Sequence, residues 1–184
     1  MASALEGLKV VEIGNILAGP FAGTLLADFG AEVIKVEPPG IGDLSRNMGR
    51  IKDMWFQTEG RNKKTVSLNL KEKKAKEMLT ELLQDADVLI ENFRPGVFAK
   101  MGFTWESLHK LNPRLVFMSS SGYGQTGPYS HKPGFDRMGL AMGGFLHVTG
   151  FPDGAPVKPG LSVADFMTAM FGVIGIMFAI YSRD

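Results

Sequence analysis

Two strand-like runs joined by an apolar helical segment constrain the fold of this chain more than any other feature. Residues 8–13 and 31–37 are short runs rich in Val and Ile, and residues 18–29 lie between them, with a proline near their start and a glycine after their end. Proline fits the first turn of a helix, and glycine suits the residue that ends one. A strand, a helix and a strand in this order form a β-α-β unit with parallel strands. The start of the chain thus predicts an α/β fold.

The same alternation continues along the chain. Three further runs read as strands: residues 64–70, 86–93 and 113–121. Apolar residues recur at helical spacing over residues 75–83, Thr104 is a suitable N-cap for a short helix, and a last helix is expected from about Ser162. No linker or repeat interrupts the pattern. We therefore expect a single domain over residues 1–184, with a mostly parallel sheet, flanking helices and a long apolar helix at its end.

Composition narrows the possible partners. The 20 Lys and Arg residues nearly balance the 19 Asp and Glu residues, which leaves a net charge of +1. Such a chain has no global attraction for nucleic acid or an anionic membrane, so we expect neither as a partner. The absence of cysteine excludes disulfides and thiolate metal ligands, and the first residues do not have the pattern of a signal peptide. These features favour a cytoplasmic protein.

The longest apolar run covers residues 166–181, which are 16 residues with two glycines. A membrane-spanning helix needs roughly 20 apolar residues. We therefore expect this run to be a buried helix or a helix at a subunit interface.

A literal GxGxxG pattern occurs at Gly122, Gly124 and Gly127, just after a predicted strand. In a dinucleotide fingerprint the glycines open a helix whose N-terminus faces the pyrophosphate. Here Pro128 and a further loop follow instead, so we do not expect a dinucleotide site.

Asp165 stands in the first turn of the last, otherwise apolar helix. Acidic residues are common in first turns, where the free N–H groups favour negative charge, so a purely structural role is one reading. The other reading is a nucleophile toward a thioester carbonyl, with a pKa lowered by the helix start. Asp136 is a second candidate, although an aspartate beginning a helix is more often a cap.

Other polar residues give weaker signals. His109 and His147 lie in helix-like segments and His131 in a loop, with no ligand spacing, so we expect no metal site; a Ser-His-Asp arrangement has no supporting motif. A basic cluster flanks the third strand, and its members are Arg61, Lys63, Lys64 and Lys71. It forms either a local phosphate site or an ordinary solvated surface.

Five blocks stand in order along the chain: residues 5–39, 89–103, 121–129, 133–145 and 160–165. Together they resemble the class III coenzyme A transferases of the CaiB/BaiF type, over essentially the whole chain. The resemblance implies a Rossmann-like, doubly wound domain that binds coenzyme A (CoA). It also implies an aspartate that attacks the acyl thioester, forming an acyl-aspartyl anhydride and then an aspartyl-CoA thioester. The matching residue is Asp165.

The resemblance also assigns the remaining site. The family's CoA-contacting segments match Asn15, Ile16, Leu17, Ala18, Leu68, Asn69, Lys71, Asn92, Phe93, Arg94, Lys100 and Met101. The implied function is a CoA transferase that moves CoA between an acyl-CoA thioester and a small carboxylic acid. Acyl-CoA is a substrate in this scheme, and no permanently bound cofactor or metal is implied.

Three positions depart from related enzymes. Leu17 stands where formyl-transferring members carry glutamine, and Pro38 stands where some members carry arginine, which makes oxalate or formate a less expected substrate. Phe135 stands where the related racemases carry a proton-transferring histidine. A phenyl ring cannot exchange a proton, so a racemase or isomerase remains only the further alternative.

Members of this family are longer, with a second small domain and a return of the chain to the first, and two of their chains interlock. The expected assembly is therefore a homodimer or a pair with a complementary chain. A chain of this length also allows another interpretation, a truncated non-catalytic CoA-binding fragment or a subunit that needs a partner chain.

Overall fold

The computed structural model describes residues 3–184 and contains a five-stranded sheet with all neighbouring strands parallel. Its strands are β1 (Lys9–Glu12), β2 (Glu32–Glu37), β3 (Lys64–Ser67), β4 (Val88–Glu91) and β5 (Val116–Ser119). The order across the sheet is β3-β2-β1-β4-β5, so the chain builds outward from β1 in one direction and then in the other. This is a doubly wound, Rossmann-like sheet, which confirms the predicted fold class.

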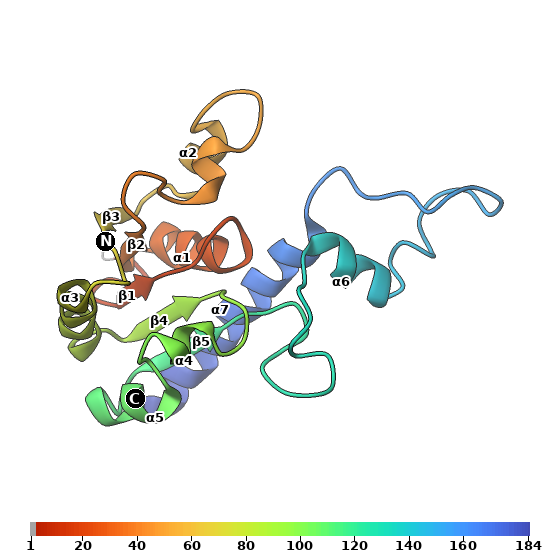
Figure 1. Cartoon of the computed structure of the whole chain (residues 1–184). Helices are drawn as coiled ribbons and strands as arrows, with labels where there is room; N and C mark the ends of the chain where they lie inside the picture. Colours follow the sequence, from red (N-terminus) through yellow and green to blue (C-terminus); the bar gives the residue numbers. More distant parts are fainter. Residues whose placement is uncertain (1–2) are drawn as a thin grey trace.

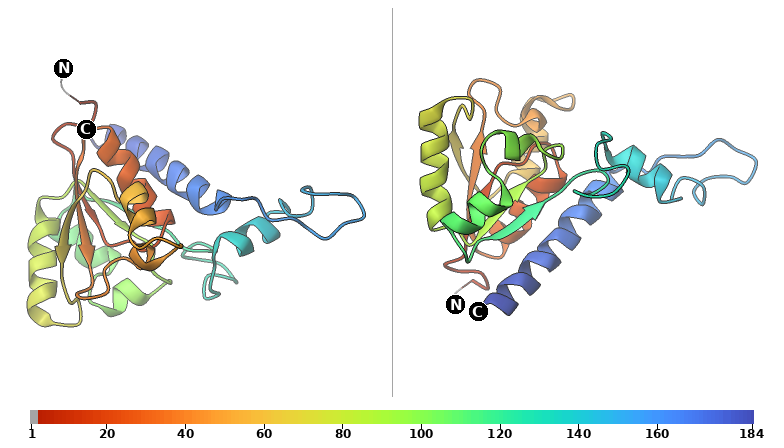
Figure 2. Two further views of the ribbon diagram at one scale, coloured as in Figure 1. Left: turned by 90° about the horizontal axis from the view of Figure 1, so that it is seen from above. Right: turned by 60° about the horizontal axis from the view of Figure 1, so that its bottom comes forward.

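Helices cover both faces of the sheet (Figures 1 and 2). They are α1 (Ala18–Asp28), α2 (Met54–Glu59), α3 (Lys73–Gln84), α4 (Val97–Lys100), α5 (Trp105–Leu111), α6 (Asp136–Met142) and α7 (Val163–Arg183), with a 3₁₀ turn η1 (Leu44–Asn47). The elements α1 and α7 pack on one face, and α3, α4 and α5 pack on the other. The expected N-cap of α5 is confirmed, because the Thr104 side chain accepts a hydrogen bond from the Ser107 N–H.

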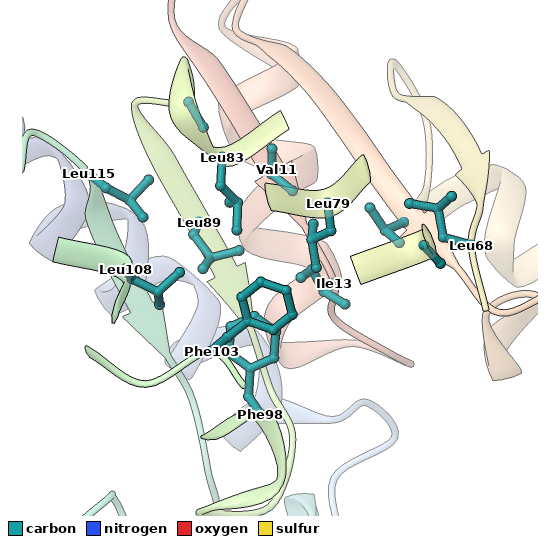
Figure 3. Close-up of a cluster of buried hydrophobic side chains, with 13 residues drawn as sticks. Val11, Ile13, Leu68, Leu79, Leu83, Leu89, Phe98, Phe103, Leu108 and Leu115 are labelled. Atoms are coloured by element: carbon teal, nitrogen blue, oxygen red, sulfur yellow. The ribbon is translucent and has the colours of Figure 1, made fainter. Parts of the chain in front are cut away.

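Alternation along the strands divides the core in two. Val10 faces α1 and α7, whereas its neighbour Val11 faces α3, as period-two side chains must. Figure 3 shows the second cluster, in which Leu79 and Leu83 of α3 meet Leu89 of β4. The inner strand β4 (VLIE) is buried along its whole length, as expected for a strand covered on both faces, whereas the edge strand β3 (KTVS) is largely exposed.

A projecting arm separates α6 from α7. Figure 2 shows the segment between these two helices extending away from the sheet. The helix α6 ends at Met142, and Gly144 then takes a left-handed backbone with φ +76°. Our placement of His147 in a helix-like segment is therefore wrong, because consecutive glycines stop the helix before it.

The helix α7 is 21 residues long, and among residues 3–184 it is the one helix with the length and composition to cross a membrane. We had judged the 16-residue apolar run too short to span a membrane. That judgement is wrong for the helix, because α7 extends beyond the run at both ends and has the required length. One such helix is weak support for a membrane span, since core helices pass the same test. Ala169 and Ile176 pack on the sheet, but Phe171, Phe178 and Tyr181 are 64%, 70% and 87% exposed. The outer side of α7 is thus an uncovered apolar face.

Candidate functional site

A cavity of about 260 Å³ lies beyond the carboxyl ends of β1, β4 and β5. Residues 15–18 after β1, 92–95 after β4 and 120–122 after β5 line it together with residues 133–136 and the first turn of α7. The strand order reverses between β1 and β4, and ligands of open α/β sheets bind at such a reversal. A larger, mostly apolar cavity, of about 610 Å³, lies between the sheet and α3, and neither Asp165 nor Asp136 lines it.

Asp165 lines the cavity from the first turn of α7. The start of this helix is fixed on α1 by the edge-to-face contact of Phe166 with Phe21, whose ring centroids are 4.7 Å apart. Burial, followed by the negative charge of Asp136, raises the pKa of Asp165 to about 6, and Lys158 partly opposes this rise. Our expectation of a pKa lowered by the helix start is therefore wrong, because desolvation and a neighbouring carboxylate outweigh it.

Asp136 is buried at the start of α6, and its Oδ1 atom accepts a hydrogen bond from the Ala164 N–H at 2.8 Å. It thus caps the beginning of α7 rather than its own helix. Its Oδ2 atom is buried without a hydrogen-bond partner and lies 3.7 Å from Lys158 Nζ. The cap joins two segments far apart in sequence and places a second carboxylate beside Asp165.

The segment after β1 is held by reciprocal side-chain contacts. The Asn15 N–H donates to Asn92 Oδ1 at 2.7 Å, and Asn92 Nδ2 donates to the Asn15 carbonyl at 2.9 Å. Ile16 has φ +68°, a left-handed backbone that is rare for a β-branched residue and costs about 1–3 kcal/mol. Its N–H donates to Asp43 Oδ1 at 3.0 Å.

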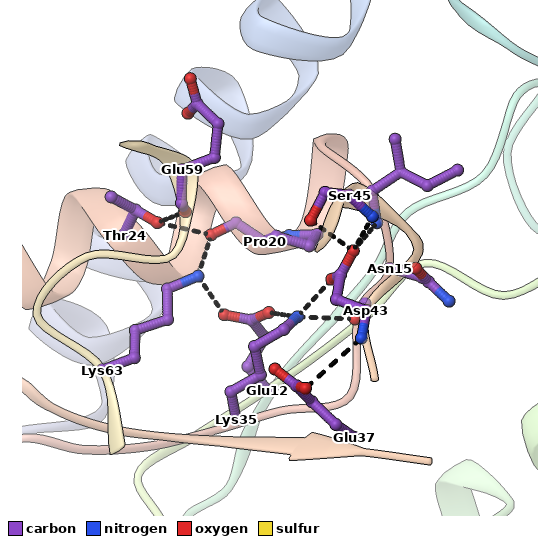
Figure 4. Close-up of polar contacts among 12 residues, drawn as sticks. Glu12, Asn15, Pro20, Thr24, Lys35, Glu37, Asp43, Ser45, Glu59 and Lys63 are labelled. Carbon is purple, nitrogen blue, oxygen red and sulfur yellow. Dashed lines mark hydrogen bonds and ion pairs between the residues drawn. The ribbon is translucent and has the colours of Figure 1, made fainter. Parts of the chain in front are cut away.

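A buried ion cluster lies next to this segment (Figure 4) and consists of Glu12, Lys35, Asp43 and Lys63. Lys35 Nζ lies 2.5 Å from Glu12 Oε1 and 2.7 Å from Asp43 Oδ2. Lys63 Nζ lies 2.7 Å from Glu12 Oε2. Burial disfavours the charge on Lys35, but Glu12 and Asp43 outweigh it and raise its pKa; for Lys63, burial dominates and lowers the pKa. Sequence reasoning missed this cluster.

The basic cluster predicted around the third strand is divided by these pairings, so a joint anion site is not formed by its members. Lys63 is buried on Glu12, Arg61 pairs with Asp28, and Lys64 pairs with Glu32. Lys71 alone is an exposed member for which the structure gives no ion pair. The interpretation as an ordinary solvated surface also fails for Lys63, because Glu12 of β1 takes this side chain into the interior.

The cavity brings together most of the predicted site, namely Asn15, Ile16, Leu17, Ala18, Asn92, Phe93, Arg94 and Asp165. Leu17 is 1% exposed, so its side chain lies beneath the cavity surface. The remaining predicted residues lie outside this cavity: Leu68 in the core, Asn69, Lys71 and Lys100 exposed, and Met101 against the core. The cavity lining also includes Phe135, which is 61% exposed.

The GxGxxG loop has a packing role. A Cβ atom on Gly122 would lie 2.3 Å from Gly134 Cα, so the two loops cross in direct contact beside the cavity. Gly124 and Gly127 have positive φ angles of 79° and 94° and form turns. The next helix, α6, begins only at Asp136. The expected absence of a helix directly after the glycines is confirmed. Over the part of the chain that the structure describes, no group of three His, Cys, Asp or Glu side chains is arranged to hold a metal ion.

Comparison with known proteins gives a consistent picture. The family model described as CoA-transferase family III matches residues 5–184. The chain is 46% identical over 184 residues to succinyl-CoA–D-citramalate CoA-transferase of Chloroflexus aurantiacus, covering 98% of this chain and 46% of that protein. It is 44% identical over 185 residues to the succinyl-CoA–L-malate CoA-transferase beta subunit of the same organism, again covering 98% and 46%.

A solved structure agrees with these relatives. The crystal structure of a CAIB/BAIF family protein from Brucella suis superposes with a TM-score of 0.96 at 40% identity, covering 100% of this chain and 50% of that one. The chain therefore spans about half the length of the proteins that it matches.

Proposed function

This chain belongs to CoA-transferase family III, and on that premise we propose that it supplies the acyl-transfer site of a CoA transferase. The enzyme moves CoA from an acyl-CoA thioester to a free carboxylic acid, with Asp165 as the nucleophile. The observation that carries the proposal is the position of Asp165, a half-buried carboxylate in a cavity at the reversal of the strand order. We further propose that the protein acts in the cytoplasm.

The first half of the reaction transfers CoA to the protein. A carboxylate oxygen of Asp165 attacks the thioester carbonyl, the C–S bond breaks, and an acyl-aspartyl anhydride and CoA thiolate form. The thiolate then attacks the aspartyl carbonyl of the anhydride. This step releases the donor acid as a carboxylate and leaves an aspartyl-CoA thioester on Asp165.

The second half repeats these steps with the acceptor. Its carboxylate attacks the aspartyl thioester, which gives a new anhydride and releases the thiolate again. Attack of the thiolate on the acceptor carbonyl produces the new acyl-CoA and regenerates the Asp165 carboxylate. Bonds formed and broken balance, so the cycle consumes no oxidant, reductant or external proton.

The surroundings of Asp165 suit this chemistry. A carboxyl whose pKa is raised to about 6 is more basic than a solvated aspartate and is therefore a stronger nucleophile, yet at pH 7 it is still ionised in about nine molecules of ten. Asp136 contributes to this rise and caps the helix that carries Asp165. The pair of carboxylates thus favours attack without preventing ionisation at neutral pH.

The size of the cavity supports a divided binding mode for CoA. A cavity of about 260 Å³ is smaller than the 300–1,000 Å³ common for sites that enclose a drug-sized ligand. We propose that it receives the acyl group and the thiol end of CoA. The nucleotide end would then extend along the same edge of the sheet, over Leu68, Asn69 and Lys71 after β3, with Lys100 and Met101 contributing after β4.

The acceptor is proposed to be a small organic acid other than oxalate or formate. Phe135 gives the cavity an apolar surface where the related racemases carry histidine, and Leu17, buried beneath that surface, supplies no polar group where formyl-transferring enzymes carry glutamine. Without a histidine at position 135, a second proton-transfer base for racemisation is lacking at that position. Transfer is therefore favoured over racemisation.

A second polypeptide surface is proposed to complete the site. The outer side of α7 exposes Phe171, Phe178 and Tyr181, an apolar surface typical of an interface. The similar L-malate CoA-transferase is named as a beta subunit, which is a precedent for assembly with another chain. A homodimer or a pair with a complementary chain would cover this face.

Intact-protein mass spectrometry tests the proposed function. The protein is incubated with succinyl-CoA, with and without hydroxylamine, which converts an aspartyl anhydride or thioester into a hydroxamate. We expect an adduct that hydroxylamine removes and that is lost in Asp165→Ala. Asp153→Ala, which changes an exposed carboxylate in the projecting arm, is the matched control and should keep the adduct. An adduct retained in Asp165→Ala would exclude the nucleophilic role, and CoA binding without any adduct would favour a subunit that requires a partner.

A further inference from the structure

The segment at residues 14–18 is held at four points, on Gly14, Asn15 and Ile16, by groups from other parts of the chain. Lys35 Nζ donates to the Gly14 carbonyl at 2.9 Å, and Asn92 contacts the Asn15 backbone on both its N–H and its carbonyl. Asn15 Oδ1 accepts from the Leu44 N–H at 2.9 Å. The fourth point is the Ile16 N–H, which donates to Asp43 Oδ1. Three of the four points therefore lead to Asp43, to the turn that it begins or to its ion partner Lys35, and only Asn92 comes from elsewhere, just after β4.

Asp43 is the centre of this arrangement. It is 1% exposed, and its Oδ1 atom accepts hydrogen bonds from the Ile16 N–H at 3.0 Å, from the Ser45 N–H at 2.8 Å and from Ser45 Oγ at 2.7 Å. Its Oδ2 atom pairs with Lys35, which holds its pKa below the ordinary value although burial alone would raise it. One carboxylate therefore joins the buried ion cluster to the backbone of the cavity wall.

Asp43 accepts its hydrogen bond from Ile16, the residue of this segment that has a left-handed backbone. An isoleucine leaves that conformation readily unless its surroundings hold it there. The hydrogen bond from its N–H to a buried, ionised carboxylate is of the strong, charge-assisted kind. Residues 15–18 then present their outer surface to the cavity that Asp165 also lines.

We propose that Asp43 is a positioning residue that holds residues 14–18 in the conformation required to bind the CoA thioester. It acts through the Ile16 N–H and through Lys35, without contacting the ligand. This inference rests on the proposed function for its binding consequence, whereas the ordering of the segment is a property of the protein alone. The two parts can therefore be measured separately.

The chain offers a control that makes the same kinds of contact at a more exposed position. Asp87 also accepts a backbone N–H, from Lys9 at 3.0 Å, and pairs with a cation, Arg183, at 3.0 Å. It precedes β4, at the opposite end of the sheet from the cavity. Replacing Asp43 or Asp87 by Asn removes the same charge and weakens a backbone contact and an ion pair in each case. The Asp87 side chain is 27% exposed against 1% for Asp43, so this control tests the loss of charge and contact rather than the loss of a buried group.

The experiment combines amide hydrogen exchange with titration calorimetry, using CoA as the probe, at a temperature where circular dichroism shows that the native protein and both variants are folded. We expect Asp43→Asn to speed exchange in the segment at residues 14–18 by at least tenfold and to weaken CoA binding by at least tenfold. Asp87→Asn should change both by less than twofold.

Two results would overturn the proposal: unchanged exchange at residues 14–18 in Asp43→Asn, or faster exchange with CoA affinity within twofold of the native value. Failure of the native protein to bind CoA would contradict the proposed function instead. Exchange alone would then decide whether Asp43 orders the segment.

Discussion

Asp136 Oδ1 accepts a hydrogen bond from the Ala164 N–H at 2.8 Å, immediately before Asp165 in the chain. A residue of α6 thereby caps α7 and brings its own negative charge close to the candidate nucleophile. The cap and the charge have separable effects, because asparagine can accept the same N–H without carrying the charge.

For Asp136→Asn we therefore expect a lower pKa at Asp165, since a negative neighbour that raises it is removed. The acid limb of the reaction should move to lower pH, and the rate at pH 8 should fall as the nucleophile becomes less basic. The pH dependence of adduct formation with succinyl-CoA measures both. An acid limb at the native position would contradict an electrostatic role for Asp136.

The ionisation of Asp165 predicts the pH dependence of the native protein. The carboxylate is the attacking form, so adduct formation should be nearly independent of pH above 7 and should fall about tenfold per pH unit well below pH 6. Rapid-quench measurements between pH 4.5 and 8.5 test this. A rate that stays constant down to pH 5 would show that a different group limits the reaction.

The same raised pKa predicts that Asp165→Asn is more stable than the native protein at high pH. The pKa of Asp165 is about 6 in the folded protein and 3.8 in the unfolded chain, so the folded protein holds this proton more tightly. The resulting stabilisation of the folded state is fully present below pH 3.8 and is lost as the pH rises through 6. Asp165→Asn should therefore exceed the native protein in unfolding free energy at pH 8, by about 1 kcal/mol after discounting for solvent screening. At pH 4.5 the difference should shrink. Urea unfolding at both pH values measures it, and a pH-independent difference would refute it.

Close packing predicts that two glycine-to-alanine substitutions have opposite effects on the unfolding free energy. A Cβ atom on Gly23 would lie 2.2 Å from Glu12 Oε2 in the buried ion cluster, whereas nothing lies within 4 Å of a Cβ on Gly175. Both glycines are inside helices, α1 and α7. We expect Gly23→Ala to destabilise the protein by about 2 kcal/mol and Gly175→Ala to stabilise it by about 0.5–1 kcal/mol in urea unfolding. Equal effects would contradict the tight fit around Glu12.

The uncovered side of α7 predicts that the protein self-associates through exposed side chains that contribute little to the stability of the fold. Replacing the exposed Phe171 and Phe178 by Ser should reduce association, measured by analytical ultracentrifugation, and change the unfolding free energy by less than about 1 kcal/mol. Ile176→Ala should instead cost about 3 kcal/mol, because that side chain is 2% exposed, and should leave association unchanged. Association that persists in the double variant would show that another surface is responsible.

Local sequence patterns were enough to predict the class of the fold, its strands and its longer helices, but not the short elements α2, α4 and η1. The β-α-β unit, the amphipathic spacing in α3 and the Thr104 cap depend on residues near one another in the chain, where propensity and periodicity act directly. Parallel pairing follows from the alternation of strands and helices. The family resemblance, not local pattern, predicted that the segments after β1 and β4 lie near Asp165. The cavity in the structure agrees with this prediction.

Contacts between distant segments were decided only by the tertiary structure. Lys63 reads as a surface charge because its immediate neighbours are polar, yet Glu12, 51 residues away, takes it into the interior. The pKa of Asp165 could not be obtained from its position at a helix start, because burial and Asp136 determine it. Local order is encoded by neighbours in the chain, whereas burial and charge pairing depend on which elements the fold places side by side.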